Sequence, residues 1–330
     1  MSARQSCARH ICARQSCARI AIAVATIALC APAQAQFAPP PQMELKKIAT
    51  DVYMMQHPVG SSNSSFVVTP DGVLVFDADI RTADQTMAAI RKTTDKKVKY
   101  LVISHPSGDH ATGGWHFRED KPIVIGTRKQ MRDLYQQENA EFTERRESNR
   151  PQFASYKGAQ LVHPEVAFEG TMTLMFGGLT FQLVEEGNIH SNSDVTMYVP
   201  LRRVMMMGDL LDTEIHPGPG ESAQVFFSNA ARWIDGMDRI IARRLPVDTF
   251  ILGHGPVHMN RGVADIEEQR RYFVVMRDEV SKMIAAGKTV EQVQAEFKVP
   301  QEFAHYKGAP RLKAFLNLFY HQLIERGFWP

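Results

Sequence analysis

The chain has 330 residues, of which 44% are hydrophobic and 22% are charged, and its formal net charge at pH 7 is +2. This is the composition of an ordinary globular protein, so collagen-like, low-complexity and largely disordered chains are excluded. The nearly balanced charge also argues against a nucleic-acid partner, because dedicated nucleic-acid binders usually carry a strongly basic face.

The first 35 residues have the features of a secretory signal peptide. Arginines recur there without any acidic residue, an apolar run extends from Ile20 to Leu29, and Ala33-Gln34-Ala35 offers a small-residue cleavage site. The apolar run is shorter than the roughly 20 residues that span a bilayer. We therefore predict cleavage after Ala35, a periplasmic or secreted location, and no stable membrane insertion of the mature chain. All four cysteines lie in this segment, so the mature chain would contain no thiol for catalysis or metal binding.

Residues 36–46 are predicted to form a proline-rich leader, after which strands and helices alternate. A hairpin is predicted at residues 66–76, where two apolar runs flank the turn Pro70-Asp71-Gly72. Further strands are predicted at residues 98–103, 122–125, 179–184, 195–199, 204–207 and 249–252. Helices are predicted at residues 84–92, 128–150, 223–243 and 311–326, with another helical stretch that begins after residue 262 and ends near Gly287.

The mixture of strands and helices in both halves, with no linker between them, predicts one α/β domain made of two similar halves. We place this domain at residues 47–262 and a helical C-terminal extension, packed on the same domain, at residues 263–330. The extension has enough apolar side chains to pack on the domain, to cover a cleft or to form a dimer. Its sequence does not choose among these, so the oligomeric state stays open.

Potential metal ligands are concentrated in the loop that follows the predicted strand at residues 98–103. His105, Asp109 and His110 lie within six residues of one another. Imidazole and carboxylate groups suit a divalent transition metal, and a turn at a strand end lets them converge. Taken alone, the loop is equally compatible with a structure that binds no metal.

Three later segments place further potential ligands at predicted strand ends. His190 follows the strand at 179–184, Asp209 follows the strand at 204–207, and His254 stands between two glycines after the strand at 249–252. An α/β sheet places its ligands at strand ends that face the same rim. The glycines beside Asp209 and His254 leave room for backbone close to a metal.

With these four motifs in order, the chain resembles the metallo-β-lactamase superfamily, whose members use a His-x-His-x-Asp-His loop, a distant His, a bridging Asp or Cys, and a final Gly-His-Gly. The resemblance covers about residues 48–260. It implies a four-layer αβ/βα sandwich with a mononuclear or dinuclear zinc site. By match, the first metal would take His105 and His190, the second would take Asp109, His110 and His254, and Asp209 would bridge them.

The chain departs from the family pattern at Ser107, which stands where the family has its second histidine. A neutral hydroxyl is a poorer zinc donor than imidazole, so the first site keeps only two histidines and the bridging aspartate. We therefore predict one tightly bound Zn²⁺ in the second site and a weak or empty first site. Iron and manganese are second choices for the metal.

These residues predict a secreted zinc-dependent hydrolase that acts on a small-molecule substrate through a metal-bound hydroxide. The bond could be an ester, amide, lactone, lactam or related bond, and β-lactam hydrolysis is one candidate. Asp109, His190 and His105 are the predicted catalytic residues, with His190 or His105 acting as general base if the first site is empty. The alternative is a non-catalytic metal-binding or ligand-binding protein of the same fold.

Five further side chains have weaker predicted roles. Asp77 either orients a metal ligand or caps a helix. His216 could line the cleft, His116 or His258 could replace the missing donor, and His57 could cover the pocket. For each of these histidines, an ordinary solvated position is the alternative.

Overall fold

The computed structural model describes residues 42–58, 61–134, 139–218 and 229–325. The predicted signal peptide and residues 36–41 of the predicted leader lie outside the described residues. Residues 43–325 of the described chain belong to one compact unit. Among the helices that the structure describes, none is both long enough and apolar enough to cross a membrane.

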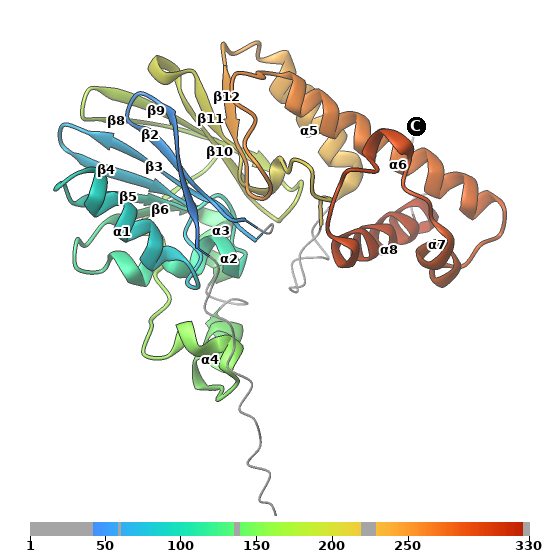
Figure 1. Ribbon diagram of the computed structural model, residues 1–330, viewed down its shortest axis with the longest axis horizontal. Helices are drawn as coiled ribbons and strands as arrows, with labels where there is room; N and C mark the ends of the chain where they lie inside the picture. The colour runs from blue at the N-terminus through green and yellow to red at the C-terminus, as the bar shows by residue number, and fades with distance from the viewer. Residues whose placement is uncertain (1–41, 59–60, 135–138, 219–228, 326–330) are drawn as a thin grey trace, which may run out of the picture. The chain divides into compact units, whose positions relative to one another are not determined.

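The first β-sheet has seven strands that follow one another in chain order (Figure 1). The strands β1 to β4 pair antiparallel, and the strands from β4 to β7 pair parallel. Their bounds are β1 (Glu44–Ala49), β2 (Val52–Gln56), β3 (Ser64–Thr69), β4 (Gly72–Phe76), β5 (Val98–Val102), β6 (Ile123–Thr127) and β7 (Val166–Phe168).

The second sheet has five strands in the order β12-β11-β10-β9-β8. Adjacent strands in this sheet pair antiparallel, except β11 and β12, which pair parallel. The bounds are β8 (Thr171–Phe176), β9 (Leu179–Gly187), β10 (Asp194–Val199), β11 (Val204–Met206) and β12 (Thr249–Ile251).

The longer helices lie on the outer faces of the two sheets and in the C-terminal region. The α-helices are α1 (Ala83–Thr93), α2 (Gly108–Ala111), α3 (Arg128–Asp133), α4 (Asn139–Glu147), α5 (Ala230–Ala242), α6 (Ala264–Ala285), α7 (Val290–Glu296) and α8 (Ala309–Glu325). Short 3-10 turns are η1 (Thr112–Phe117), η3 (Pro151–Tyr156), η4 (Pro200–Arg202), η5 (Gly208–Leu210) and η7 (Gln301–Phe303).

Strand β4 shows how the layers are built. It is buried along its whole length, as expected for an inner strand covered on both faces. Val73 and Val75 pack in the cluster that contains Ile90 of α1, whereas Leu74 and Phe76 pack in the core shared with the second sheet. The sheets therefore face each other with helices outside, which confirms the predicted four-layer αβ/βα sandwich.

The helices α6 and α8 share their core with α5 and the second sheet. The ring of Phe273 in α6 lies 4.6 Å from Trp233 of α5 and 5.4 Å from Phe315 of α8, measured between centroids. Burial of such aromatic side chains is a major source of packing energy. The predicted C-terminal extension is thus bound to the domain through a continuous hydrophobic core.

Several element boundaries differ from the predictions. Strand β1 begins at Glu44, so residues 44–46 of the predicted leader form part of the first sheet. The helix predicted at 128–150 is two helices in the described chain, with residues 135–138 outside it. In the described part of the helix predicted at 223–243, α5 begins at Ala230, because Asn229 accepts hydrogen bonds from the N–H groups of Ala231 and Arg232.

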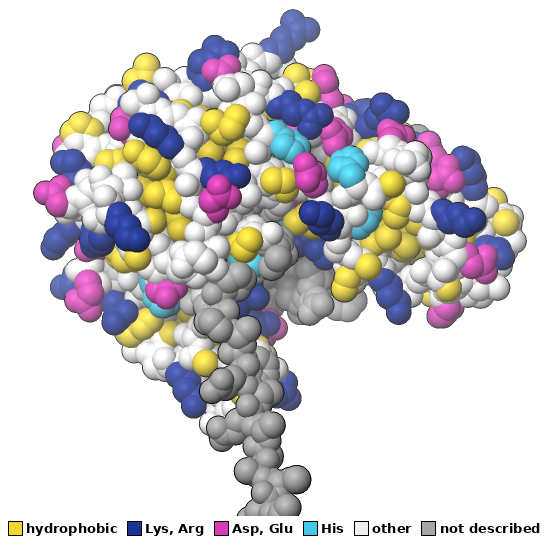
Figure 2. Space-filling model, in the orientation of Figure 1, with side chains coloured by type: hydrophobic (Ala, Val, Ile, Leu, Met, Phe, Trp, Pro, Cys, Tyr) yellow, Lys and Arg dark blue, Asp and Glu magenta, His cyan; other side chains and the backbone are white. Residues whose placement is uncertain are grey.

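Basic and acidic side chains are interspersed on the face of the protein shown in Figure 2.

The strands β1, β2, β7 and β8 were not predicted individually. Strand β8 is at a sheet edge and alternates exposed with half-buried side chains. Its pattern has no buried apolar run, which was the main signal used to predict the other strands.

Candidate metal centre

Six side chains that the sequence singled out lie together at one edge of the two sheets. They come from the loop after β5, from α2, from the loop after β9, from η5 and from the loop after β12. Their ligand atoms form two groups, each within 4.8 Å, and the members are His105, His190 and Asp209 in the first group and Asp109, His110 and His254 in the second. All are buried except Asp109, which is half-buried.

Asp209 connects the two groups. Its Oδ1 lies 3.0 Å from Nε2 of His110, and its Oδ2 lies 3.2 Å from Nε2 of His254. The same Oδ2 is 3.6 Å from Nε2 of His190 and 3.8 Å from Nε2 of His105. One carboxylate therefore faces four imidazoles and could be shared by two metal positions.

The chemistry of these atoms fits a divalent transition metal. The Nε2 atoms of His105, His110 and His190 and Oδ1 of Asp209 are buried, and among the described residues they have no hydrogen-bond partner apart from the contact between His110 and Asp209. A buried polar atom without a partner costs about 1–3 kcal/mol, so a cluster of them needs an explanation. Two ligands at 2.0–2.1 Å from a tetrahedral zinc are about 3.3 Å apart, which is close to the separations around Asp209.

Ser107 occupies a buried position between the two ligand-bearing segments of the first loop. It precedes α2, and its carbonyl oxygen accepts hydrogen bonds from the N–H groups of His110 at 3.0 Å and Ala111 at 2.9 Å. The first ligand group thus has three members, Asp209 included. The second group would have four members if Asp209 is counted with it.

Asp77 orients two of the imidazoles. One carboxylate oxygen accepts the N–H of Ser104 at 2.7 Å, and the other accepts the Ser104 hydroxyl at 2.7 Å and lies 3.0 Å from Nδ1 of His110. The Ser104 hydroxyl is in turn 2.8 Å from Nδ1 of His105. Partners on Nδ1 fix the ring orientation and leave Nε2 directed at the centre. The alternative role of helix cap is wrong, because α1 begins after Thr82.

Asp194 shapes the loop that carries His190, and it was missed in the sequence. Its carboxylate accepts the N–H groups of Ile189, His190 and Ser191 and the hydroxyl of Ser191, at 2.7–3.1 Å. Burial raises the pKa of Asp194, although His190 and these hydrogen bonds act in the opposite direction. A local signal existed, since an aspartate at the end of a short polar loop commonly accepts bonds from the loop backbone.

The loop that carries His254 is fixed by close packing and by Asn63. The Asn63 amide donates to the carbonyl oxygens of Leu252 at 3.2 Å and Gly255 at 3.1 Å. A Cβ atom on Gly253 would lie 2.0 Å from Oδ1 of Asp209, so only glycine leaves space for that carboxylate. This close approach explains why the residue before His254 is a glycine.

The charges in the centre are strongly coupled. Burial alone would raise the pKa of Asp209, but the charges of His110, His254 and His105 hold it well below its usual range. Burial similarly opposes the charged form of Asp109, yet the same kind of histidine contacts lower its pKa to about 2. The two carboxylates therefore stay ionised and attract a cation at neutral pH, and a metal ion would displace any proton held by the histidines.

Three of the weaker histidine candidates lie outside the two ligand groups. His116 approaches the carbonyl oxygen of Ile80 at 3.2 Å, and His216 is buried with Nδ1 2.8 Å from the hydroxyl of Tyr272. His57 is buried, and its Nδ1 accepts the N–H of Ser61 at 3.2 Å. None of these three histidines belongs to a ligand group in the described chain.

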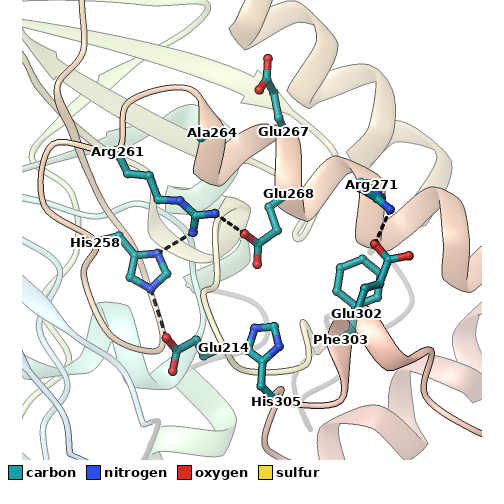
Figure 3. Close-up of a pocket in the computed structure, with 10 residues that line it drawn as sticks. All are labelled: Glu214, His258, Arg261, Ala264, Glu267, Glu268, Arg271, Glu302, Phe303 and His305. Atoms are coloured by element: carbon teal, nitrogen blue, oxygen red, sulfur yellow. Dashed lines mark hydrogen bonds and ion pairs between the residues drawn. The ribbon is translucent and has the colours of Figure 1, made fainter.

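The fourth candidate, His258, lines a separate cavity of about 590 Å³ (Figure 3). Its Nδ1 lies 2.9 Å from Asp265, and its Nε2 lies 3.3 Å from Glu214. Arg261 and Glu268 form an ion pair at 2.6 Å on the wall of the same cavity. His258 is therefore held by two carboxylates away from the ligand groups, so the prediction that it could replace the missing donor is wrong.

Comparisons with known proteins agree with this architecture. The linear primary-alkylsulfatase of Pseudomonas sp. (strain ATCC 19151) is 19% identical over 288 residues, in a match that covers 78% of this chain and 54% of that protein. The solved structure of the stereoselective inverting sec-alkylsulfatase from Pseudomonas sp. has a TM-score of 0.64 at 16% identity, covering 87% of this chain and 51% of that one. The chain thus spans about half the length of these alkylsulfatases.

A second kind of neighbour has about the size of the two-sheet domain. The metallo-beta-lactamase from Pontibacter korlensis has a TM-score of 0.54 at 18% identity, and the match covers 70% of this chain and 99% of that one. The sequence pattern of the metallo-beta-lactamase superfamily matches residues 57–254, which is more than half of the chain. This match extends from before the first ligand loop to His254 and covers the strands β3 to β12, so the chain belongs to the metallo-beta-lactamase superfamily.

Proposed function

We propose that the protein is a metal-dependent hydrolase of small molecules, with zinc as its metal. The observation that carries the proposal is the position of Asp209 between two groups of buried ligands, three of whose imidazole Nε2 atoms have no other partner in the described chain. Membership of the superfamily supports it, and the similar proteins include an alkylsulfatase and a metallo-beta-lactamase.

We assign the two ligand groups to two unequal metal positions. The first position has three protein donors and the second has four when the shared Asp209 is counted. We therefore propose tight binding of one zinc ion by Asp109, His110, His254 and Asp209, and weak or no binding beside Ser107. Iron and manganese are the alternatives to be compared with zinc.

A zinc ion held by Asp109, His110, His254 and Asp209 would supply a water with a pKa of about 7 and would polarise the bond under attack. The protein side chains supply position and proton transfer. Asp109 is the half-buried member of the centre, so its carboxylate lies where solvent and substrate approach. If the first position is empty, Nε2 of His105 or His190 is available to accept a proton from water, a role that contributes about 10²–10⁴-fold in rate.

The bond that is cleaved belongs to the ester, amide, lactone or lactam type, or to a related class. The alkylsulfatase relatives add sulfate esters to this set, since the same centre could activate water toward sulfur, phosphorus or carbon. The competing function is a non-catalytic protein that binds a metal or ligand with the same fold. The three-membered first group is the observation that favours this competitor.

The test is turnover by protein that has been stripped with a chelator and reloaded with zinc, manganese or ferrous iron. The panel contains nitrocefin, an acyl-homoserine lactone, a thioester, bis(4-nitrophenyl) phosphate and a linear alkyl sulfate. We expect zinc to restore activity toward at least one substrate, with loss in Asp209→Asn. His321→Asn, which changes an exposed histidine of α8, is the matched control and should retain activity. A fully zinc-loaded protein without turnover would favour the non-catalytic alternative.

We also propose that the mature protein starts at Gln36 and acts in the periplasm or outside the cell. The basic amino-terminal segment, its short apolar run and the Ala-Gln-Ala site support this. Mass spectrometry of protein recovered from an exporting host should give a mass that begins at Gln36. An intact amino terminus or lipid on Cys30 would contradict the proposal.

A further inference from the structure

Asp212 is a buried carboxylate three residues after the shared ligand Asp209. Its backbone forms a parallel β-bridge with His254, and the next residue, Thr213, donates its N–H to the carbonyl oxygen of His254 at 3.3 Å. The segment that carries Asp212 is therefore hydrogen-bonded directly to the loop that carries a proposed metal ligand.

The charge of Asp212 is compensated from the C-terminal extension. The Asp212 side chain is 1% exposed, and its Oδ2 accepts a hydrogen bond from Nη2 of Arg311 at 2.9 Å. Its Oδ1 is buried without a hydrogen-bond partner in the described chain. A buried carboxylate that loses its cation is strongly destabilised. Arg311 therefore supplies the positive charge that compensates the buried carboxyl group of Asp212.

Arg311 also binds the far end of the same loop. Its Nε donates to the carbonyl oxygen of His216 at 2.9 Å, so one guanidinium connects Asp212 to His216. Lys307 reinforces this arrangement, because its N–H donates to the carbonyl oxygen of Glu214 at 2.9 Å and its carbonyl oxygen accepts the N–H of His216 at 2.9 Å. Residues 307–311 therefore line the loop at residues 212–216 along its length.

The loop is anchored from its buried side as well. Nδ1 of His216 lies 2.8 Å from the hydroxyl of Tyr272 in α6, and the ring of Tyr272 stacks on Tyr306 with centroids 5.1 Å apart. The N–H of Asp212 donates to Oε1 of Gln269, also in α6, at 2.6 Å. Both ends of the loop are thus attached to the C-terminal helices by polar contacts.

We infer that Arg311 is a positioning residue of the metal centre and that the helical C-terminal extension is a working part of that centre. By pairing with Asp212 and with the carbonyl of His216, Arg311 fixes the loop that lies between Asp209 and the loop of His254. The inference rests on the proposed metal-binding function and extends it to a residue far from the ligands in sequence.

A purely electrostatic role for Arg311 predicts the opposite effect. Removing a positive charge near the centre while the loop stays in place would favour a bound cation, and zinc would bind more tightly. Loss of a positioning contact would instead disturb His254 and Asp209, and zinc would bind more weakly. The direction of the change in zinc affinity therefore separates the two roles.

The experiment compares wild type, Arg311→Met, Asp212→Asn and the double variant, without substrate. The zinc dissociation constant is measured by competition with a chromophoric chelator, and the absorption spectrum of the Co²⁺-loaded protein reports ligand geometry. We expect Arg311→Met to weaken zinc binding by about 10–100-fold, as is usual for partners of metal ligands, and to change the Co²⁺ spectrum. The double variant should recover only part of the affinity, because a neutral amide needs no cation but the contact to the carbonyl oxygen of His216 is still missing.

Arg270→Met is the matched control, since it removes an exposed arginine–aspartate pair between α6 and α5, with Asp238 as the partner. Its zinc affinity should equal that of wild type. Unchanged or tighter binding in Arg311→Met, or wild-type affinity in the double variant, would overturn the inference. If Arg311→Met does not fold, weaker zinc binding by the double variant than by wild type supports the inference, and wild-type affinity overturns it. Because these measurements need no turnover, a negative substrate screen would reject the hydrolase proposal while leaving this inference to its own test.

Discussion

Ser107→His should convert an asymmetric centre into one that holds two zinc ions. Ser107 is 6% exposed and lies between His105 and Asp109, in the loop that already supplies ligands to both groups. Its carbonyl accepts two N–H groups of α2, so the backbone at this position is fixed and the new side chain would start from a defined place. The substitution adds an imidazole beside a group that has three donors.

The magnitude follows from two opposing effects. Enlarging a buried side chain usually costs about 1–3 kcal/mol, so the metal-free variant should be less stable than metal-free wild type by about that amount. Zinc at 100 times its dissociation constant stabilises a single-site protein by about 2.7 kcal/mol. A newly formed site should therefore restore most of the lost stability when zinc is added.

Metal content after dialysis and denaturant unfolding with and without zinc provide the assay. We expect about one retained equivalent of zinc in wild type and about two in Ser107→His. Ser107→Asn is the matched control, because it enlarges the side chain without adding an imidazole and should retain about one equivalent. Two tightly held equivalents in wild type, or a single equivalent in Ser107→His, would refute the reasoning.

Three further substitutions test the surroundings of the centre. Asp77→Asn removes the carboxylate that faces Ser104 and His110. Chelator competition should show a zinc affinity lower by about 10–100-fold. An unchanged zinc affinity would contradict the role of Asp77 in orienting the histidine ligands. Asp194→Ala leaves buried N–H groups of the His190 loop unpaired, so urea unfolding should show a loss of about 1–3 kcal/mol or more, and a neutral effect would be inconsistent with the contacts. Burial, with a smaller contribution from Arg311, lowers the pKa of His216 to about 4, so the unfolded chain binds the extra proton below pH 6.5. The stability contributed by the neutral imidazole is complete above pH 6.5 and is lost as the pH falls toward 4. In urea unfolding of the metal-free proteins, the free energy of unfolding of His216→Gln should fall by about 1–3 kcal/mol less than that of wild type over this range. An identical dependence of the free energy of unfolding on pH in the two proteins would contradict the assignment.

The central strands and the ligand set were predictable because their signals are local. Buried strands such as β5 and β10 consist largely of apolar residues, and each ligand-bearing segment follows a strand closely. Sheet geometry brings those strand ends to one edge, and the resemblance to the metallo-β-lactamase superfamily implied how the side chains divide into two groups.

Other features depend on contacts that the sequence does not encode locally. Asp212 and Arg311 meet only because α8 packs against the loop after η5, and neither residue belongs to a recognisable motif. His258 is close to His254 in sequence, yet its bonds to Asp265 and Glu214 direct it to another cavity. The edge strand β8 has no buried side chain, because its residues alternate between an exposed and a half-buried face. Tertiary packing decides each of these cases.

The most direct test of the account is a zinc titration of the metal-free protein, followed by hydrolysis of whichever substrate in the panel is cleaved. The account predicts no turnover without metal, activity that rises with added zinc and saturates near the first tightly bound equivalent, and no such rise in Asp209→Asn. Turnover by the stripped protein, or a rise in activity in Asp209→Asn that equals wild type, would contradict a centre built around Asp209.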